Sequence, residues 1–390
     1  MDFHLTDEQR QIQQLARDFA KKEVAPKAAH HDESGEFPQD ICKKAWELGL
    51  MNGHIPEQYG GMGLGVFDAC LIAEEIAAGC TGIGTAMEAN NLAQAPLIVA
   101  GSDSQKKQFL TPMTEELIFA AYAVTEPAAG SDVAGIKTVA RRVGGDYVLN
   151  GQKMWITNAG VASWYYVLAY TDRSAGHRGM SAFIVPKDSA GITVGKKEMN
   201  MGQRASDTRA ISFEDVKVPA ANLLGSEGQG FKISMSAFDH TRPLVSAAAV
   251  GLARSAMEHA VAYAKQRETF GQPIANNQAI SFMLADMDKD IQAARLLVWL
   301  SCWLIDQGMP NTREASMAKA FAADTAVKVA SDAVQIFGGY GYSREYPVEK
   351  LMRDSKIFQI YEGTSQIQRI IISRQLLAGE TRAPQTGAGR

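Results

Sequence analysis

Apolar residues recur at helical spacing through the first third of the chain. Near the N-terminus, Thr6-x-x-Gln9 forms a capping-box pattern just before Ile12, Leu15 and Phe19, which is typical of a helix start. The segments VFDACLIAEEIAAG and SQKKQFLTPM continue the spacing between glycine-rich turns. This pattern predicts an N-terminal helical domain over residues 1–117.

The pattern changes near residue 118. Short runs of β-branched and aromatic residues follow, separated by Gly, Asn, Asp and Pro: FAAYAVTE, SWYYVLAYT, SAFIVPK and ISFEDVKVP. Such runs predict antiparallel strands in a small barrel or sandwich. In DYVLNGQKMW, Asn150-Gly151 stands between two apolar runs and predicts a hairpin turn. We therefore expect a middle β domain over residues 118–227.

From residue 228 the helical spacing returns in four long segments, 229–266, 276–308, 312–337 and 364–378, with Gly- and Pro-containing breaks between them. These segments predict a C-terminal four-helix bundle over residues 228–390. Its last dozen residues, 379–390, have the composition of a flexible tail.

The order of elements defines the fold class. Helices are followed by strands and then by helices, with no alternating βα pattern, so a Rossmann fold is not expected. The sequence predicts an α+β protein that is mainly α, with a middle β domain between two helical domains.

Composition and charge narrow the function. The net charge is -4, which does not suggest a nucleic-acid or anionic membrane partner. Four cysteines without CxxC spacing and seven scattered histidines form no metal-site pattern, and a reducing compartment fits them best. Because no apolar stretch is long enough to span a membrane, we expect a soluble, cytoplasmic protein.

The candidate for chemistry is Glu362, the one carboxylate in IYEGTSQIQR, just before a predicted helix. An acid at a helix start is favoured by the helix dipole and is common for that reason alone. The same carboxylate could also serve as a general base if burial raised its pKa. The residue pattern by itself leaves both interpretations open.

Several blocks of the chain together resemble the acyl-CoA dehydrogenase family: AYAVTEPAAGSDVAGI, NGQKMWITNAG, QRETFGQPIANNQ and DAVQIFGGYGYSREYPVEKLMRDSKIFQIYEGTSQIQR. The resemblance covers residues 3–378 and is strongest to the medium-chain branch, through MNMGQRASDTR and AFDHTRP. It implies the helix–strand–helix fold, an FAD cofactor and a catalytic base at Glu362. Some branches carry the base at the position of Thr241, which cannot serve as one.

The resemblance also implies cofactor contacts. They are Tyr122, Val124, Thr125, Trp155, Ile156 and Thr157 on the strands that flank the flavin, and Thr364 and Gln366 at its nucleotide half. Those implied across a subunit boundary are Arg267, Phe270, Gln278, Gln335, Gly338 and Gly339, so we expect a homotetramer built as a dimer of dimers. Taken singly, the strand residues could equally be ordinary barrel residues. Arg267 could be a helix-terminal cation.

The resemblance assigns further residues to the acyl-CoA substrate: Ser131, Asp239, Arg242, Tyr361, Gly363, Gly84 and Glu88. A local ion pair between Asp239 and Arg242 is the alternative. In one departure, Gly308-Met309-Pro310 stands where medium-chain relatives have an Arg. Gly84 and Glu88 share a helix face, and the small residue is expected to deepen or widen the acyl pocket. The alternatives are that Met87 or another neighbour fills the gap, or that Gly84 is only a helix-start glycine.

We therefore expect an FAD-dependent dehydrogenase that converts a short- to medium-chain acyl-CoA to the trans-2-enoyl-CoA and passes electrons to an electron-transfer flavoprotein. Glu362 would take the α-proton, and its backbone N–H would donate to the thioester carbonyl. The alternatives are an acyl-CoA oxidase, an acyl-CoA desulfinase or a non-catalytic helical scaffold.

Overall fold

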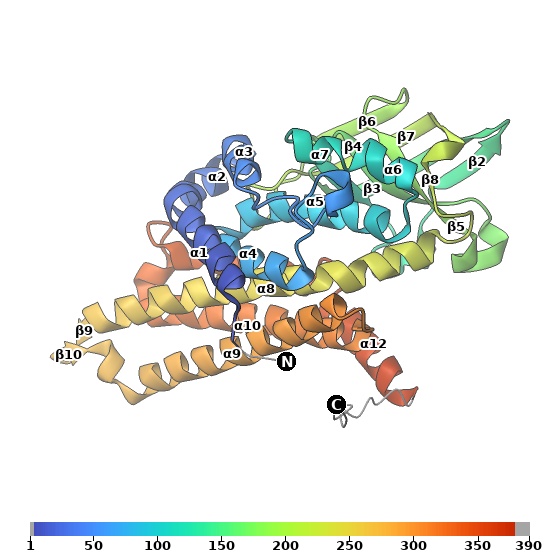
Figure 1. The fold of residues 1–390 in the computed structure, drawn as a ribbon. Coiled ribbons are helices and arrows are strands. Elements are labelled where there is room, and N and C mark those ends of the chain that lie inside the picture. The colour runs from blue at the N-terminus through green and yellow to red at the C-terminus, as the bar shows by residue number, and fades with distance from the viewer. Residues whose placement is uncertain (1–3, 379–390) are drawn as a thin grey trace.

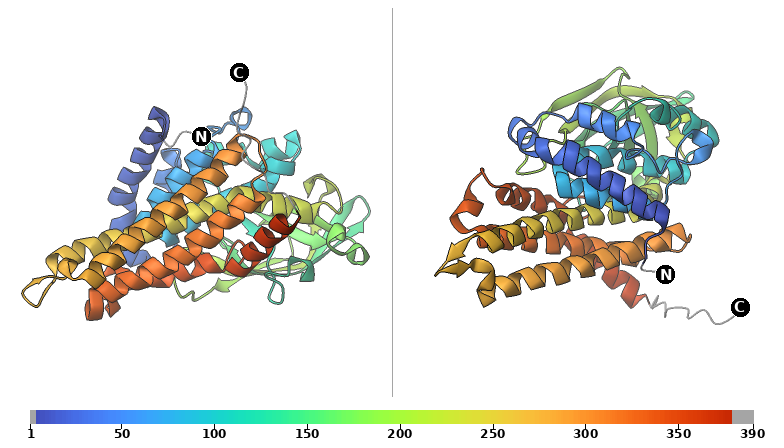
Figure 2. Two further views of the ribbon diagram at one scale, coloured as in Figure 1. Left: turned by 90° about the horizontal axis from the view of Figure 1, so that it is seen from below. Right: turned by 60° about the vertical axis from the view of Figure 1, so that its left-hand side comes forward.

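The computed structural model describes residues 4–378. Helices, then strands, then helices follow one another along the chain, and the strand layer lies above long helices that run side by side (Figures 1 and 2). The α+β fold class predicted from the sequence is confirmed. The predicted flexible tail, residues 379–390, lies outside the described residues. No helix in the described part of the chain could cross a membrane.

The N-terminal helices begin as the sequence predicts. The Thr6 hydroxyl accepts a hydrogen bond from the Gln9 backbone N–H at 3.1 Å, and the Gln9 side chain accepts one from the Thr6 N–H at 3.0 Å, so the capping box is formed. The helices are α1 (Asp7–Phe19), α2 (Ala28–Ser34), α3 (Gln39–Glu47), α4 (Val66–Gly79), α5 (Thr81–Ala100), α6 (Asp103–Phe109) and α7 (Pro112–Glu115).

The middle strands form one sheet in the order β6-β7-β3-β2-β4-β5-β8, with β1 beside β4. Their bounds are β1 (Ala120–Ala123), β2 (Val139–Val143), β3 (Asp146–Thr157), β4 (Trp164–Tyr170), β5 (Met180–Pro186), β6 (Ile192–Lys197), β7 (Thr208–Val218) and β8 (Leu223–Leu224). The expectation of antiparallel strands is wrong at one place, because β1 and β2 both pair with β4 in parallel. Neither strand precedes β4 directly, so no hairpin dictates their direction.

The predicted hairpin at Asn150-Gly151 is also wrong. Both residues lie inside the continuous strand β3, and the turn falls at Gly144-Gly145, where Gly144 adopts φ 63°. The Asn150 side chain instead bonds Asp215 on β7 in both directions, at 2.9 and 3.0 Å. A Cβ at Gly151 would lie 2.4 Å from the Thr138 hydroxyl, so the glycine permits close strand approach rather than a turn.

The sheet folds over a core of its own, as expected of a barrel or sandwich. Alternate residues of β4 point to opposite sides. Tyr165 and Val167 pack with β3 and β7, whereas Tyr166 and Leu168 pack with α5 and the helices after it. Because both faces of β4 are covered, the strand is apolar throughout.

The C-terminal helices are α8 (Gly230–Gln266), α9 (Gln278–Asp306), α10 (Thr312–Phe337), α11 (Pro347–Ser355) and α12 (Ser365–Leu377). The short strands β9 (Glu268–Thr269) and β10 (Gln272–Pro273) join α8 to α9. The core of the bundle continues into α4 through Ala69, Cys70 and Ala73. Asp306 at the end of α9 accepts the first N–H groups of α4, those of Val66 and Phe67, at 2.8 and 3.0 Å, which binds the first helices to the bundle.

Candidate active site

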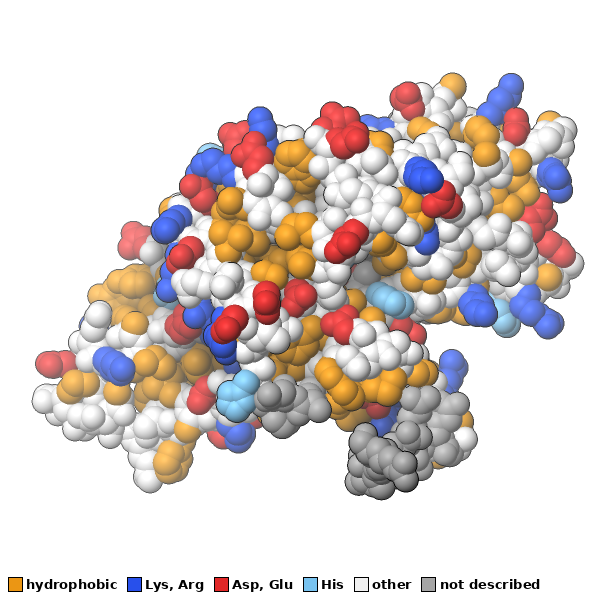
Figure 3. Space-filling view, viewed as in Figure 1, with side chains coloured by type: hydrophobic (Ala, Val, Ile, Leu, Met, Phe, Trp, Pro, Cys, Tyr) orange, Lys and Arg blue, Asp and Glu red, His pale blue; other side chains and the backbone are white. Residues whose placement is uncertain are grey.

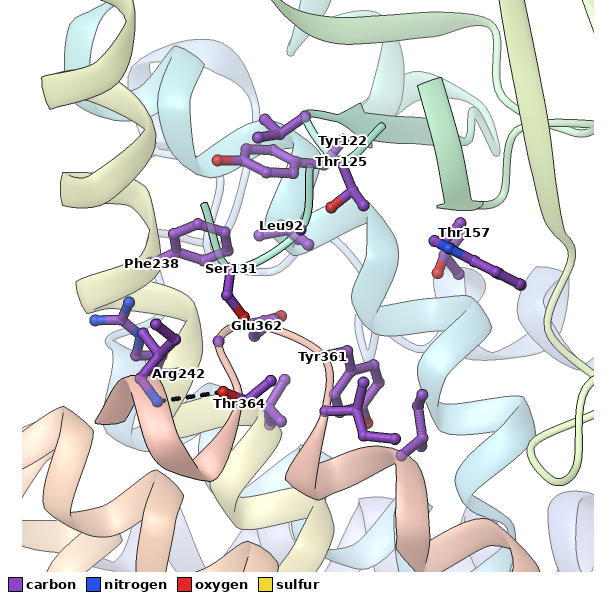
Figure 4. A pocket seen from close by; sticks show the side chains of 18 of the residues that line it. Leu92, Tyr122, Thr125, Ser131, Thr157, Phe238, Arg242, Tyr361, Glu362 and Thr364 are labelled. Carbon is purple, nitrogen blue, oxygen red and sulfur yellow. Dashed lines mark hydrogen bonds between the residues drawn. The ribbon is translucent and has the colours of Figure 1, made fainter. Parts of the chain in front are cut away.

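A cavity of about 1360 Å³ lies between the sheet and the helices (Figure 4). Its walls come from α5, the segment after β1, the end of β3, α8 and the loop before α12. The volume exceeds that of a pocket for one drug-sized ligand. Residues more than two hundred positions apart in sequence thus face one space.

The segment after β1 is held by buried polar contacts. Asn90 on α5 accepts from the Ala120 N–H and donates to the Ile118 carbonyl, both at 2.9 Å, which fixes the start of β1. Beyond the strand, the buried Lys153 ammonium bonds the Glu126 carboxylate at 2.9 Å and the Val124 carbonyl at 3.0 Å. These contacts hold Tyr122, Val124 and Thr125 on the cavity wall.

Trp155 projects into the cavity region because β3 is irregular there. The register with β7 shifts between Lys153 and Ile156, and Trp155 adopts φ 63°, a conformation rare for a bulky residue. Its side chain remains 56% exposed although its neighbour Ile156 is buried. Trp155, Ile156 and Thr157 all line the cavity, and a bulge that re-aims a side chain is common beside functional sites.

Glu362 lies in the loop between α11 and α12, two residues before Thr364, which caps α12 by accepting from the Ile367 N–H at 3.2 Å. Glu362 itself has φ 51°, and Gly363 has φ 91°. The Glu362 side chain faces the cavity, as do Tyr361 and Thr364 (Figure 4). Among the described residues, no backbone carbonyl accepts from the Glu362 N–H.

Opposing effects set the pKa of the Glu362 carboxyl near neutral pH. Burial raises the pKa of its carboxyl to about 7, while a hydrogen bond from Thr241 and the charges of Lys319 and Arg242 oppose the rise. The Thr241 hydroxyl donates to Glu362 Oε2 at 2.9 Å. A carboxylate with such a pKa in a deep cavity is typical of an enzyme active site.

A second carboxyl, Glu88 on α5, lines the same cavity. Burial raises its pKa to about 7, the charge of Glu362 adds to the rise, and a hydrogen bond from Asn91 at 2.9 Å opposes it. Gly84, one turn earlier, also lines the cavity, and a Cβ there would meet Ile76 at an ordinary 3.5 Å. The predicted pair therefore shares one region of the wall.

Of the remaining predicted substrate residues, Ser131 and Arg242 line the cavity, and Gly363 adjoins Glu362. Asp239 does not line the cavity. Its carboxylate bonds Arg242 at 3.1 Å and the Thr312 hydroxyl at 2.7 Å. The local ion pair that the sequence left open is therefore formed.

The predicted inter-subunit residues lie apart from this cavity. Arg267 and Phe270 flank the β9–β10 turn, with Arg267 5.6 Å from the ring centre of Tyr340. Gln335, Gly338 and Gly339 are close to Tyr340 in sequence, and Gln278 begins α9. Phe270 is almost fully exposed. Gln366 is also exposed and does not line the cavity.

Sequence reasoning gave no site role to two residues that contact Glu362 or its loop. The sequence marks Thr241 only as a position that cannot hold a base, yet its hydroxyl donates to Glu362. Lys319 bonds two backbone carbonyls of the Glu362 loop. No pattern in the sequence links these residues to Glu362, because the first lies 121 positions away and the second acts through the backbone.

Three family models match the chain: acyl-CoA dehydrogenase N-terminal domain over residues 6–116, middle domain over 121–216 and C-terminal domain over 228–377. The chain is 48% identical to a probable medium-chain specific acyl-CoA dehydrogenase of Caenorhabditis briggsae, over 97% of this chain and 92% of that protein. These matches show that the chain belongs to the acyl-CoA dehydrogenase family, whose members are FAD-dependent oxidoreductases.

Two solved structures extend the comparison. Butyryl-CoA dehydrogenase from Megasphaera elsdenii is 44% identical, with TM-score 0.94 over 97% of this chain and all of that chain. A chain from a study of the electron transferring flavoprotein of Acidaminococcus fermentans is 45% identical, with TM-score 0.95 over the same shares.

The residues on the cavity wall fit a flavin. Trp155 offers an exposed aromatic face at the end of β3, and Thr125 and Thr157 line the cavity beside it. In Figure 4, Thr125 and Thr157 lie on the sheet side of the space, and Glu362 lies on the loop before α12. A flat aromatic cofactor and an acyl chain could thus be held between the sheet and the base.

Proposed function

We propose that this enzyme catalyses the FAD-dependent α,β-dehydrogenation of an acyl-CoA thioester to the trans-2-enoyl-CoA. The observation that carries the proposal is the Glu362 carboxyl, which faces the cavity with a pKa raised to about 7. A base with this pKa is ionised often enough to act and basic enough to accept a proton. The Thr241 hydroxyl is its hydrogen-bond donor rather than a competing base.

In this proposal Glu362 removes the proton from the carbon next to the thioester carbonyl. The Glu362 backbone N–H, which finds no backbone acceptor within residues 4–378, donates to that carbonyl as negative charge develops on it. Tyr361 and the apolar wall exclude water, which strengthens both interactions. When bound, FAD supplies the acceptor for the β-hydrogen and its electron pair.

The residues proposed to hold the flavin ring are Tyr122, Val124, Thr125, Trp155, Ile156 and Thr157. All of them line the cavity, and the first three are fixed by the buried Lys153–Glu126 pair. Thr364 borders the same space. The thioester and pantetheine would extend past Ser131 and Arg242.

The acyl group is proposed to be a short- to medium-chain, uncharged one. The cavity near α5 presents small apolar residues together with Glu88. Because the pKa of Glu88 is about 7, its carboxyl is partly ionised and would repel an anionic acyl end. This argues against a desulfinase or a dicarboxyl-CoA substrate, and it agrees with the butyryl and medium-chain names of the similar proteins.

We further propose a homotetramer, a dimer of dimers, in which Arg267 and its neighbours contact a cofactor bound to another subunit. Large apolar side chains are exposed on the C-terminal helices and the β9–β10 turn: Phe270, Phe282, Leu296, Phe321, Leu376 and Leu377. Figure 3 shows hydrophobic side chains gathered over the end of the bundle where β9, β10 and α9 lie. Exposed apolar surface of this kind is common at subunit interfaces.

The proposed electron acceptor is an electron-transfer flavoprotein, in keeping with the study from which one similar structure comes. The proposed location is the cytoplasm. All four cysteines are free and buried, which suits a reducing compartment.

The test is Glu362→Gln, which keeps the side-chain shape but removes the base. We expect flavin content and acyl-CoA binding to be retained and anaerobic flavin reduction by substrate to fall by several orders of magnitude. Glu88→Gln is the matched control, because it alters the other cavity carboxyl. The flavin of this variant should still be reduced by substrate. Reduction of Glu362→Gln at a rate near that of the wild type would disprove the assignment.

A further inference from the structure

The loop that carries Glu362, residues 358–364, has a backbone that needs support. Glu362 adopts φ 51° and Gly363 φ 91°. The left-handed region is unfavourable for a residue with a side chain, so such a conformation persists only where surrounding contacts enforce it. The support is therefore to be sought in residues that bond this loop.

Lys319, in the middle of α10, provides that support. Its ammonium donates to the Phe358 carbonyl at 2.6 Å and to the Gly363 carbonyl at 2.7 Å. One acceptor precedes Glu362 and the other follows it directly, so a single nitrogen spans the turn. Gln368 on α12 adds weaker bonds from its amide to the carbonyls of Glu362 and Gly363, at 3.2 and 3.0 Å.

Lys319 is fully buried, and its partners are carbonyls rather than carboxylates. The nearby Asp324 is already bonded to Gln359, Ser365 and Arg369, at 2.6–3.0 Å. A buried ammonium without a carboxylate contact is costly. Its charge acts most strongly on Glu362, and burial lowers the pKa of Lys319 to about 7.

We infer that Lys319 is a positioning residue for the base: it fixes the strained turn from both sides and places a positive charge near the Glu362 carboxylate. This inference rests on the proposed function, in which Glu362 is the base. The helix α10 is part of the bundle core, so the turn is held against a rigid element rather than against another loop.

The charge has a definite consequence for pH dependence. Because the pKa of Lys319 is about 7, its ammonium is charged mainly on the acid side of neutrality. There the cation favours the ionised form of Glu362 and lowers its pKa, so its removal moves the acid limb of the reaction to higher pH. The charged or titratable groups that act on Glu362 or are acted on by it come from several elements: Lys319 on α10, Arg242 on α8, Glu88 on α5, Tyr122 on β1 and Tyr361 beside it. The test must therefore change Lys319 alone.

The experiment compares Lys319→Met with Lys328→Met in the holoenzyme. Lys328 lies on the same helix but is half-exposed and paired with Asp290 at 3.1 Å. The control therefore removes an equal positive charge at a place distant from the Glu362 loop. Anaerobic flavin reduction by butyryl-CoA is measured against pH, with flavin content and melting temperature for each variant. The Glu362 carboxyl is also titrated by infrared difference spectroscopy, with its band assigned by its loss in Glu362→Gln.

For Lys319→Met we expect full flavin content, a midpoint about one pH unit higher and a plateau rate reduced roughly ten- to hundred-fold by misplacement of the base. Lys319→Gln, which keeps a neutral donor, should show the same shift of midpoint with a smaller loss of rate. Gln368→Met loses hydrogen bonds but no charge, so its midpoint should stay in place.

Several outcomes would overturn the inference. One is a Lys319→Met enzyme that matches Lys328→Met in midpoint and plateau. Another is a failure of both Lys319 variants to fold, which would assign the residue to the stability of the bundle instead. Flavin reduction in Glu362→Gln at the wild-type rate would instead disprove that Glu362 is the base. Failure of the inference about Lys319 and failure of the proposed function are therefore distinguishable.

Discussion

Replacement of Thr241 by Val tests how the pKa of the base is set. The Thr241 hydroxyl donates to Glu362 Oε2 at 2.9 Å, and valine has nearly the same shape but no donor. A donor to the carboxylate favours the ionised form. The substitution should therefore raise the pKa of Glu362 above its value of about 7.

The size of the effect follows from the hydrogen bond. A bond to a charged group contributes about 1.5–3 kcal/mol, and one pKa unit corresponds to about 1.4 kcal/mol. We use the lower end of this range and expect a rise of about one unit. At pH 7 the ionised fraction then falls from about one half to about one tenth, and the rate roughly fivefold.

The assay is the rate of anaerobic flavin reduction by butyryl-CoA from about pH 6 to about pH 9. The Thr241→Val curve should lie to the alkaline side of the wild-type curve and meet it at high pH, where both bases are ionised. Thr241→Ser keeps the hydroxyl and should restore the wild-type midpoint. An unchanged or lower midpoint for Thr241→Val would refute the electrostatic role of the hydroxyl.

Three further predictions concern the cavity and the assembly. A Cβ at Gly84 fits beside Ile76 at 3.5 Å, so Gly84→Gln should fill the acyl region and shift kcat/KM towards shorter chains in a series from butyryl- to palmitoyl-CoA, at about 0.8 kcal/mol per excluded methylene. An unchanged profile with normal stability would exclude Gly84 from the acyl pocket. Light scattering should give the mass of a tetramer, and Arg267→Ala should release flavin on dialysis. A monomer that retains all its flavin would contradict this proposal. Glu88→Gln removes a like charge from the cavity, so the acid limb of flavin reduction should move to lower pH, and a shift to higher pH would contradict the coupling.

The helices could be predicted from the sequence because their signals are local. The segment predicted at 312–337 is α10 to the residue, and the Thr6 capping box formed as expected. Where a local signal competed with pairing across the sheet, the prediction failed. Asn150-Gly151 resembles a hairpin turn, but the bonds of Asn150 to Asp215 and the close approach of Gly151 to Thr138 keep the pair inside β3.

For the site, a motif identified Glu362, but its environment could not be predicted. The contacts that tune the carboxyl come from Thr241 on α8 and Lys319 on α10, and both depend on how these helices pack around the loop. The same packing decides that Asp239 bonds Thr312 and lies outside the cavity wall, although it is three residues from Arg242. Helical spacing shows which side chains share a face but not what the face meets.

The two cavity carboxyls show why Glu362, the proposed base, needs hydrogen-bond donors and cations around it. Burial raises the pKa of both Glu88 and Glu362 to about 7, and the charge of Glu362 adds to the rise at Glu88. If Glu362 had no cationic or hydroxyl partner, burial would keep its proton in place at neutral pH. Thr241, Lys319 and Arg242 all act on Glu362, whereas Glu88 has one amide donor, Asn91. Glu362 thus reaches a pKa of about 7 with three partners that favour its charge, whereas Glu88 reaches the same value with one donor and the like charge of Glu362.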